Sequence, residues 1–288
     1  MSTTDLPTAD YVEAHPHSSR QARAIAEAGT VLRVQVGSGV HGTAVNGTDD
    51  RDEMGVCLEP PACVTGIARV PNPAGASGAT VPFEQWEYHT AWQRDGGLAN
   101  RSGAGDLDVI VYSARKFAQL AASGNPTVLL PLFVPESEVV TVTDAGRELR
   151  DGAAAFASMH AAQRFRGYMA KQRSGISGER GRTNRPELVA EFGYDCKYAM
   201  HALRLGLQGI EYLTTGRITL PVPEPHLTAL REVRQGLWSL ADVLAWYDDL
   251  DVQLTALAAT EPLPPEPDRA WIDGWLHRSY TRFWAASE

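Results

Sequence analysis

The sequence predicts an α+β protein in which a small mixed β-sheet module, residues 1–135, packs against a helical module, residues 136–288. Two segments, 31–37 and 106–112, show the period of two that is typical of strands. From Asp144 onward the pattern is helical. The 288 residues, 43% of them hydrophobic, suffice for a sizeable core in one large domain or two.

Composition narrows the class of protein. The net charge of −9 argues against nonspecific binding to nucleic acid or to acidic membranes through the whole surface. No basic segment followed by an apolar one opens the chain, and no apolar run is long enough to span a bilayer, so we expect a soluble protein. Three cysteines are too few for a disulfide framework or a cysteine-rich metal site, and they fit the reducing cytoplasm. The histidines without a partner at ligand spacing, which we assign to surface or structural roles, are His15, His17 and His89.

The first informative stretch is a helix, a strand and a glycine turn. The Ala-rich segment 19–29 ends in glycine and reads as a helix that leads into the strand. The strand ends at Gly37, and Gly37 and Gly39 allow a sharp backbone turn. Ser38 lies between them and offers a hydroxyl and an N–H, which suits a phosphate oxygen.

Paired aspartates follow this turn. If the chain is extended at Asp50-Arg51-Asp52, the two carboxylates project from one face, because strand side chains alternate. Two carboxylates on one face suit a divalent cation such as magnesium, which prefers oxygen ligands. The alternative is a solvated hairpin turn that includes Asp49, since aspartate is favoured in turns.

A dinucleotide site is a second alternative for the glycine turn. Residues 37–42 match the G-x-G-x-x-G pattern, and Glu59 lies at a suitable distance for a ribose contact. That fingerprint needs a helix facing the pyrophosphate, but residues 43–54 have no helical apolar repeat. The pattern therefore disfavours a dinucleotide site.

The order Gly-Ser, short loop, Asp-x-Asp and hydrophobic strand resembles the signature of the DNA polymerase beta-like nucleotidyltransferase superfamily. The resemblance implies that Gly37 and Ser38 hold phosphate and that Asp50 and Asp52 are metal ligands.

A third carboxylate is expected on a later strand. After strand-like segments at 55–59 and 83–92, residues 106–112 place Asp106, Asp108 and the apolar residues beyond them on one strand face. Two-metal sites need a further carboxylate. We choose Asp108, which precedes the apolar run, and Asp106 is its rival.

Residues 108–132 sharpen the resemblance. Ser113 is expected to cap a helix that runs to about Ala122, and Asn125-Pro126 to start another. An acid, a Tyr-Ser-x-Arg-Lys-Phe helix start and a Gly-Asn-Pro junction in this order are similar to a subfamily of predicted nucleotidyltransferases, some of them named for RNA-repair gene neighbourhoods. Lys116 either binds the nucleotide phosphates or lies on a solvated face.

Basic residues concentrate between residues 160 and 210. Nine basic and four acidic side chains give this region a local net charge of +5. A triphosphate or an RNA end needs such neutralisation, and a charge-balanced helix surface is the alternative. The basic residues are Arg164, Arg166, Lys171, Arg173, Arg180, Arg182, Arg185, Lys197 and Arg204.

One helix in this region carries a polar face. Lys197, His201 and Arg204 recur at i, i+4 and i+7, and Gly206 would let a neighbouring element approach closely. The run resembles the same subfamily's Gly-Tyr-Asp-x-Lys-x-x-x-His-x-x-Arg pattern. It departs at Cys196, where a threonine-like residue is expected, but this position lies off the polar face.

The C-terminal part reads as two helices joined by a proline linker. One long helix is expected over 225–259, and a last aromatic helix over 271–284 that closes the core.

The resemblance implies a metal-dependent enzyme that moves a nucleoside monophosphate from an NTP to an acceptor hydroxyl and releases pyrophosphate, with RNA as the favoured acceptor. Two magnesium or manganese ions would bind Asp50, Asp52 and Asp108. Lys197, His201 and Arg204 would stabilise the pyrophosphate charge. The alternatives are an enzyme that nucleotidylates a protein or a small molecule, and a noncatalytic protein that binds nucleotide or RNA.

Overall fold

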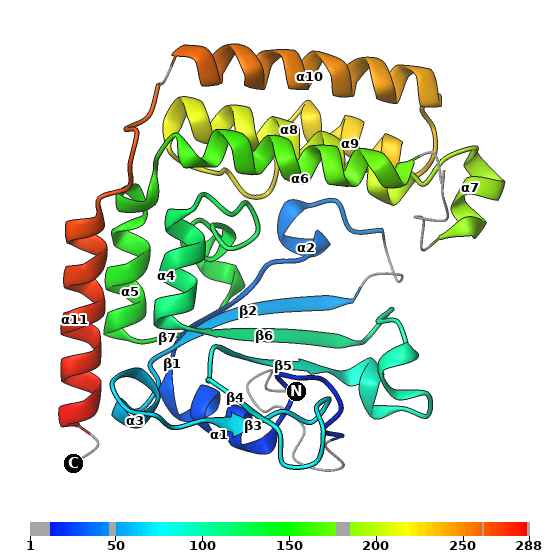
Figure 1. The fold of residues 1–288 in the computed structure, drawn as a ribbon. Coiled ribbons are helices and arrows are strands. Elements are labelled where there is room, and N and C mark those ends of the chain that lie inside the picture. Colours follow the sequence, from blue (N-terminus) through cyan, green and yellow to red (C-terminus); the bar gives the residue numbers. More distant parts are fainter. Residues whose placement is uncertain (1–11, 46–49, 177–184, 261, 287–288) are drawn as a thin grey trace.

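The computed structural model describes residues 12–45, 50–176, 185–260 and 262–286, and it has the predicted α+β architecture (Figure 1). The strands are β1 (Thr30–Gln35), β2 (Arg51–Cys57), β3 (Val70–Pro71), β4 (Thr80–Val81), β5 (Gln85–His89), β6 (Leu107–Ser113) and β7 (Val139–Val142). The helices are α1 (Arg20–Gly29), α2 (Ser38–His41), α3 (Pro61–Val64), α4 (Ala114–Ala122), α5 (Asp144–Asp151), α6 (His160–Ile176), α7 (Pro186–Phe192), α8 (Cys196–Thr215), α9 (His226–Arg234), α10 (Leu240–Thr260) and α11 (Arg269–Ala285).

Five strands form a mixed sheet in the order β5-β6-β2-β1-β7. β2 and β6 are parallel, and the other neighbouring strands are antiparallel. The parallel pair aligns Asp52 with Asp108, and the antiparallel β5 aligns His89 with the same Asp108. The outer strand β7 lies beyond residue 135, so the sheet takes a strand from the segment assigned to the helical module, and the division into two modules stays a prediction.

The alternation of side chains divides the sheet into two faces. Val109 and Val111 of β6 belong to a small core with Trp86 of β5 and with Ala22 and Ala26 of α1. The side chains that alternate with these valines on β6, and their neighbours on β2, point to the other face of the sheet. That face packs against α4 and the C-terminal helices. The face covered by the helices also carries the aspartates, because they alternate with the buried valines.

The helical module lies over this second face (Figure 1). α8 packs against α6, α9 and α10. A Cβ on Gly206 would lie 3.0 Å from Leu250 Cβ of α10 and 3.3 Å from Met169 Sδ of α6, which confirms that this glycine allows close approach. α11 runs beside α4 and α5, where Trp275 is buried. Within the part of the chain that the structure describes, no helix is long and apolar enough to cross a membrane.

Three local predictions are wrong. The helix expected over 225–259 is two helices, α9 and α10, because Gly236 takes a φ of 73° in the break between them. Asn125-Pro126 starts no α-helix; turns lead from it into a 3-10 helix at Leu130–Leu132, and the Asn125 carboxamide oxygen accepts from the N–H of Thr127. The second strand begins at Arg51, four residues before the expected start.

Gly29 gives a prediction about how the sheet is assembled. A Cβ there would lie 2.1 Å from the Leu58 carbonyl oxygen, which follows the end of β2. We expect Gly29→Ala to lower the free energy of unfolding by about 1–3 kcal/mol, because the backbone must shift to relieve the clash. Urea denaturation measures this loss. Gly103→Ala is the matched control, since a Cβ at Gly103 meets nothing within 4 Å. Equal stability of the two variants would contradict the packing argument.

Candidate active site

Three carboxylates converge at the N-terminal ends of β2 and β6. Asp50 precedes β2, Asp52 is its second residue, and Asp108 is the register partner of Asp52 on β6. One ligand oxygen from each lies within 4.8 Å of the others. Burial, followed by the charges of Asp50 and Asp108, raises the pKa of Asp52 to about 6. The triad therefore concentrates negative charge in a small volume, which suits a divalent cation.

The structure distinguishes Asp108 from its rival Asp106. Asp106 accepts hydrogen bonds from the Thr90 hydroxyl, at 2.8 Å, and the Gly103 N–H, at 2.9 Å, and is paired with Arg94, at 2.9 Å. Burial alone would raise the pKa of Asp106, but these three partners outweigh it and hold the pKa below its ordinary value. Asp106 thus anchors the loop before β6, and Asp108 is the strand's contribution to the triad.

The glycine turn lies directly against Asp52. A Cβ on Gly37 would lie 2.1 Å from Asp52 Oδ2, so only glycine leaves room for that carboxylate. Gly37 is followed by the one-turn helix α2, which the sequence pattern did not predict. The buried Ser38 Oγ has no hydrogen-bond partner among the described residues. Glu59, the ribose contact of the dinucleotide alternative, lies beyond the other end of β2 and accepts a hydrogen bond from Tyr280 at 2.7 Å.

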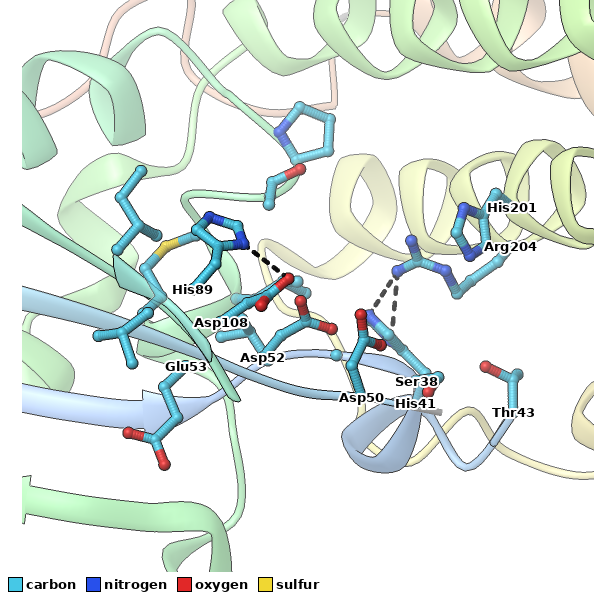
Figure 2. A pocket seen from close by; sticks show the side chains of 18 of the residues that line it. Ser38, His41, Thr43, Asp50, Asp52, Glu53, His89, Asp108, His201 and Arg204 are labelled. Atoms are coloured by element: carbon cyan, nitrogen blue, oxygen red, sulfur yellow. Dashed lines mark hydrogen bonds and ion pairs between the residues drawn. The ribbon is translucent and has the colours of Figure 1, made fainter. Parts of the chain in front are cut away.

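The polar face of α8 lies across the same cavity, which has a volume of about 500 Å³ and is lined by Gly37, Ser38, the triad, Lys197, His201 and Arg204. Figure 2 shows Arg204 and His201 on one side of the triad and His89 on the other. The Lys197 ammonium has no ion-pair partner among the described residues. We call Arg185, Lys197, His201 and Arg204 the cationic wall.

Arg204 and His201 differ in charge. Arg204 donates to His41 Nε2 at 2.6 Å and to Gln208 Oε1 at 3.0 Å, both neutral partners, and burial lowers its pKa to about 10. It remains a cation at neutral pH. Burial, then the charges of Arg204 and Lys197, lower the pKa of His201 well below its ordinary value. His201 is therefore a neutral hydrogen-bonding group and not a third cation.

The structure brings in residues that the sequence pattern did not assign to the site. His89 Nδ1 lies 2.9 Å from Asp108 Oδ2, and the His89 ring stacks on Trp92 with 3.8 Å between centroids. The Ser102 hydroxyl donates to the other Asp108 oxygen at 2.6 Å. The structural role predicted for His89 is incomplete, because His89 also orients Asp108. The sequence indicated a strand at 83–92, but the contact between His89 and Asp108 follows only from the register of that strand with β6.

Two predicted contributors stand elsewhere. Lys116 does not line the cavity, and its ammonium is paired with Glu84 at 2.9 Å and lies over the Tyr112 ring at 6.0 Å. Within the basic run, Arg166 is paired with Asp251 at 2.9 Å. Asp49 and the basic residues Arg180 and Arg182 lie outside the described residues. Of this run, Arg185, Lys197 and Arg204 line the cavity.

Comparison with known proteins agrees with this geometry. The model of the RNA repair pathway DNA polymerase beta family matches residues 14–278. No curated protein and no solved structure shows a significant match. The match covers the sheet, the triad and the cationic wall, and it confirms the resemblance inferred from the sequence motifs.

The raised pKa of Asp52 gives a pH-dependent prediction for the metal-free protein. Since its folded-state pKa, about 6, exceeds the ordinary 3.8, its contribution to stability is full below pH 3.8 and is lost as pH rises through 6. In EDTA at pH 8, we expect the free energy of unfolding of Asp52→Asn to exceed that of the wild type by up to about 3 kcal/mol. At pH 4 we expect no such difference. Urea denaturation at both pH values measures the difference.

At pH 8, magnesium or manganese should make the wild type more stable than Asp52→Asn. We expect either ion to raise the melting temperature of the wild type and to leave Asp52→Asn unchanged, because the variant lacks the central carboxylate. Asp248→Asn is the control, since Asp248 is exposed on α10 far along the chain from the triad. Equal stabilisation of all three proteins would contradict a metal site at the triad.

Proposed function

The chain belongs to the RNA repair pathway DNA polymerase beta family and is a nucleotidyltransferase, and we propose that it transfers a nucleoside monophosphate from an NTP to a hydroxyl of RNA, releasing pyrophosphate. The observation that carries the proposal is one cavity with three carboxylates at its centre and a cationic wall on one side. Nucleotidyl transfer needs both, because the phosphate charge must be held while the α-phosphorus is attacked. The family's description supports RNA as the acceptor.

We propose Asp50, Asp52 and Asp108 as the ligands of two divalent cations, magnesium or manganese. The three converging oxygens fit such ions, and the pKa of Asp52 is raised although Lys197 and His89 lie near enough to lower it. Bound there, the ions supply charge stabilisation of the reacting phosphoryl group and activation of the acceptor hydroxyl. Asp50, Asp52 and Asp108 would together hold the ions, with Asp108 on the side of the acceptor.

The opposite charges of the cavity give the triphosphate an orientation. The Ser38 hydroxyl, which has no partner among the described residues, would donate to a triphosphate oxygen. Lys197 and Arg204 would neutralise the leaving pyrophosphate. A neutral His201 would donate a hydrogen bond to the same group, and the contacts of Arg204 with His41 and Gln208 hold the guanidinium in place before any ligand binds.

Asp108 has a second task on the acceptor side. His89 contacts one carboxylate oxygen of Asp108 and Ser102 the other, so together they restrict rotation of the carboxylate. The acceptor oxygen forms its bond with the α-phosphorus as the bond from that phosphorus to the bridging oxygen of the pyrophosphate breaks. The hydroxyl proton passes to Asp108.

A cytoplasmic location stays a prediction from the cysteine content.

Transfer of an α-label tests the function. We expect the wild type with magnesium or manganese to transfer label from at least one α-labelled NTP, and none from the γ-labelled NTP, to RNA. Asp52→Ala and Asp108→Ala should lower the rate about 10²-fold or more, because the charged phosphoryl group loses its stabilisation. A wild type that binds no NTP and labels no RNA, protein or small-molecule acceptor would refute the proposal.

Lys197→Ala tests the orientation of the triphosphate. We expect its KM for the NTP to rise about tenfold, because one charged contact to phosphate is lost. Lys116→Ala is the matched control and should leave that KM within about twofold, since Lys116 does not line the cavity. A larger rise in the KM for the NTP in Lys116→Ala than in Lys197→Ala would contradict binding of the triphosphate at the cationic wall.

A further inference from the structure

The cavity continues beyond Asp108, on the side away from the cationic wall. Ile110 and Tyr112 follow Asp108 on one face of β6, and all three line the cavity. The register sets Glu87 of β5 and Met54 of β2 on either side of Ile110. Because Glu87 is two residues before His89, this extension lies on the His89 side of the triad. We call it the strand lobe.

The lining of the strand lobe differs from that of the cationic wall. Its apolar contributors are Met54 and Ile110 from the sheet and Pro126 and Leu130 from the turn that covers it. Among the described lining residues, all the lysines and arginines belong to the cationic wall. The lining of the strand lobe offers no lysine or arginine to a polyphosphate or to the RNA backbone, since Lys116 approaches the Tyr112 ring from outside this lining and is paired with Glu84. Its apolar surface suits a flat apolar group.

Two polar groups break the apolar surface of the strand lobe. The Tyr112 side chain is partly buried and lines the cavity. Burial, followed by the charges of Glu87 and Tyr168, raises the pKa of Tyr112 to about 12, so its O–H is available as a donor. Glu87 is held by the Gln85 amide and by His15 Nδ1, at 3.5 Å, and its carboxylate keeps lone pairs for a further donor.

The geometry of transfer decides which substrate reaches the strand lobe. The attacking and leaving oxygens lie roughly in line through the α-phosphorus. With the pyrophosphate on the cationic wall, the acceptor hydroxyl must approach from the opposite side of the triad. That side is the strand lobe, so its occupant is the part of the acceptor next to the reacting hydroxyl.

The chemistry of the strand lobe identifies this part. A nucleobase has apolar faces that pack on aromatic and aliphatic side chains, and an edge with both N–H donors and acceptors. Such an edge matches a carboxylate and a phenolic O–H. A polyamine would need several free carboxylates, whereas the lining has Glu87 and Glu53 outside the triad, and Glu53 is paired with Arg33 and Arg51. We propose that Glu87, Tyr112 and the apolar residues around them bind the nucleobase of the RNA nucleoside whose hydroxyl is the acceptor; the proposal rests on the proposed function.

The test compares two RNA oligonucleotides that differ only at the acceptor nucleotide, one with its nucleobase and one abasic. For the wild type we expect the abasic oligonucleotide to have an acceptor KM about tenfold or more higher, the scale of one stacked and hydrogen-bonded base, with kcat for transfer changed less. Fluorescence anisotropy without NTP should show the same ratio of Kd values. This comparison uses the wild type alone and does not depend on the folding of a variant.

Variants then assign the effect to residues. We expect Glu87→Gln and Tyr112→Phe to reduce the preference for the intact oligonucleotide to about threefold or less, with the KM for the NTP within about twofold. Glu84→Gln is the matched control, since Glu84 is exposed and does not line the cavity; it should keep the wild-type preference.

The outcomes separate this inference from the proposed function. If the wild type labels and binds both oligonucleotides equally, or labels a polyamine or a protein in preference to RNA, the nucleobase subsite is refuted while nucleotidyl transfer stands. If the intact oligonucleotide is preferred but Glu87→Gln and Tyr112→Phe keep that preference, the base lies elsewhere. If the wild type transfers label to no acceptor and binds no NTP, the proposed function fails and the subsite falls with it.

Discussion

The mutual repulsion of three carboxylates is the constraint on which the site depends. The parallel pairing of β2 with β6 aligns Asp52 with Asp108, and Asp50 enters the same space from the loop before β2. The carboxylates cannot move apart, because the strand register holds two of them and Gly37 packs against Asp52. The result is a raised pKa at Asp52 and a local concentration of negative charge that suits a divalent cation.

The surroundings of the triad are polarised. On one side the cationic wall offers a buried guanidinium and an unpaired ammonium, and on the other the strand lobe offers apolar surface with one phenol and one carboxylate. The sheet supplies the second side and α8 most of the first. A charged leaving group and a flat neutral group would therefore bind at opposite ends of the same cavity, with the reacting bond between them.

The sequence predicts the class of fold and most of the centre of the site, for reasons that are local. Strand alternation places Asp52 and Asp108 on definite faces, and helical spacing places Lys197, His201 and Arg204 together. What it misses depends on tertiary structure. The role of His89 follows from the register of β5 with β6, and the charge state of His201 from its burial beside Arg204 and Lys197. The sheet strand β7 is likewise set by long-range pairing with β1 that no local pattern indicates. The break between α9 and α10 has a local signal, Gly236, which the predicted single helix overlooked.

Binding of manganese, followed by electron paramagnetic resonance with a nonreactive NTP analogue, tests whether the triad holds the divalent cations that nucleotidyl transfer needs. We predict two manganese ions per chain for the wild type and loss of this binding in Asp52→Ala. Unchanged manganese binding in Asp52→Ala, or no binding by the wild type, would contradict this prediction.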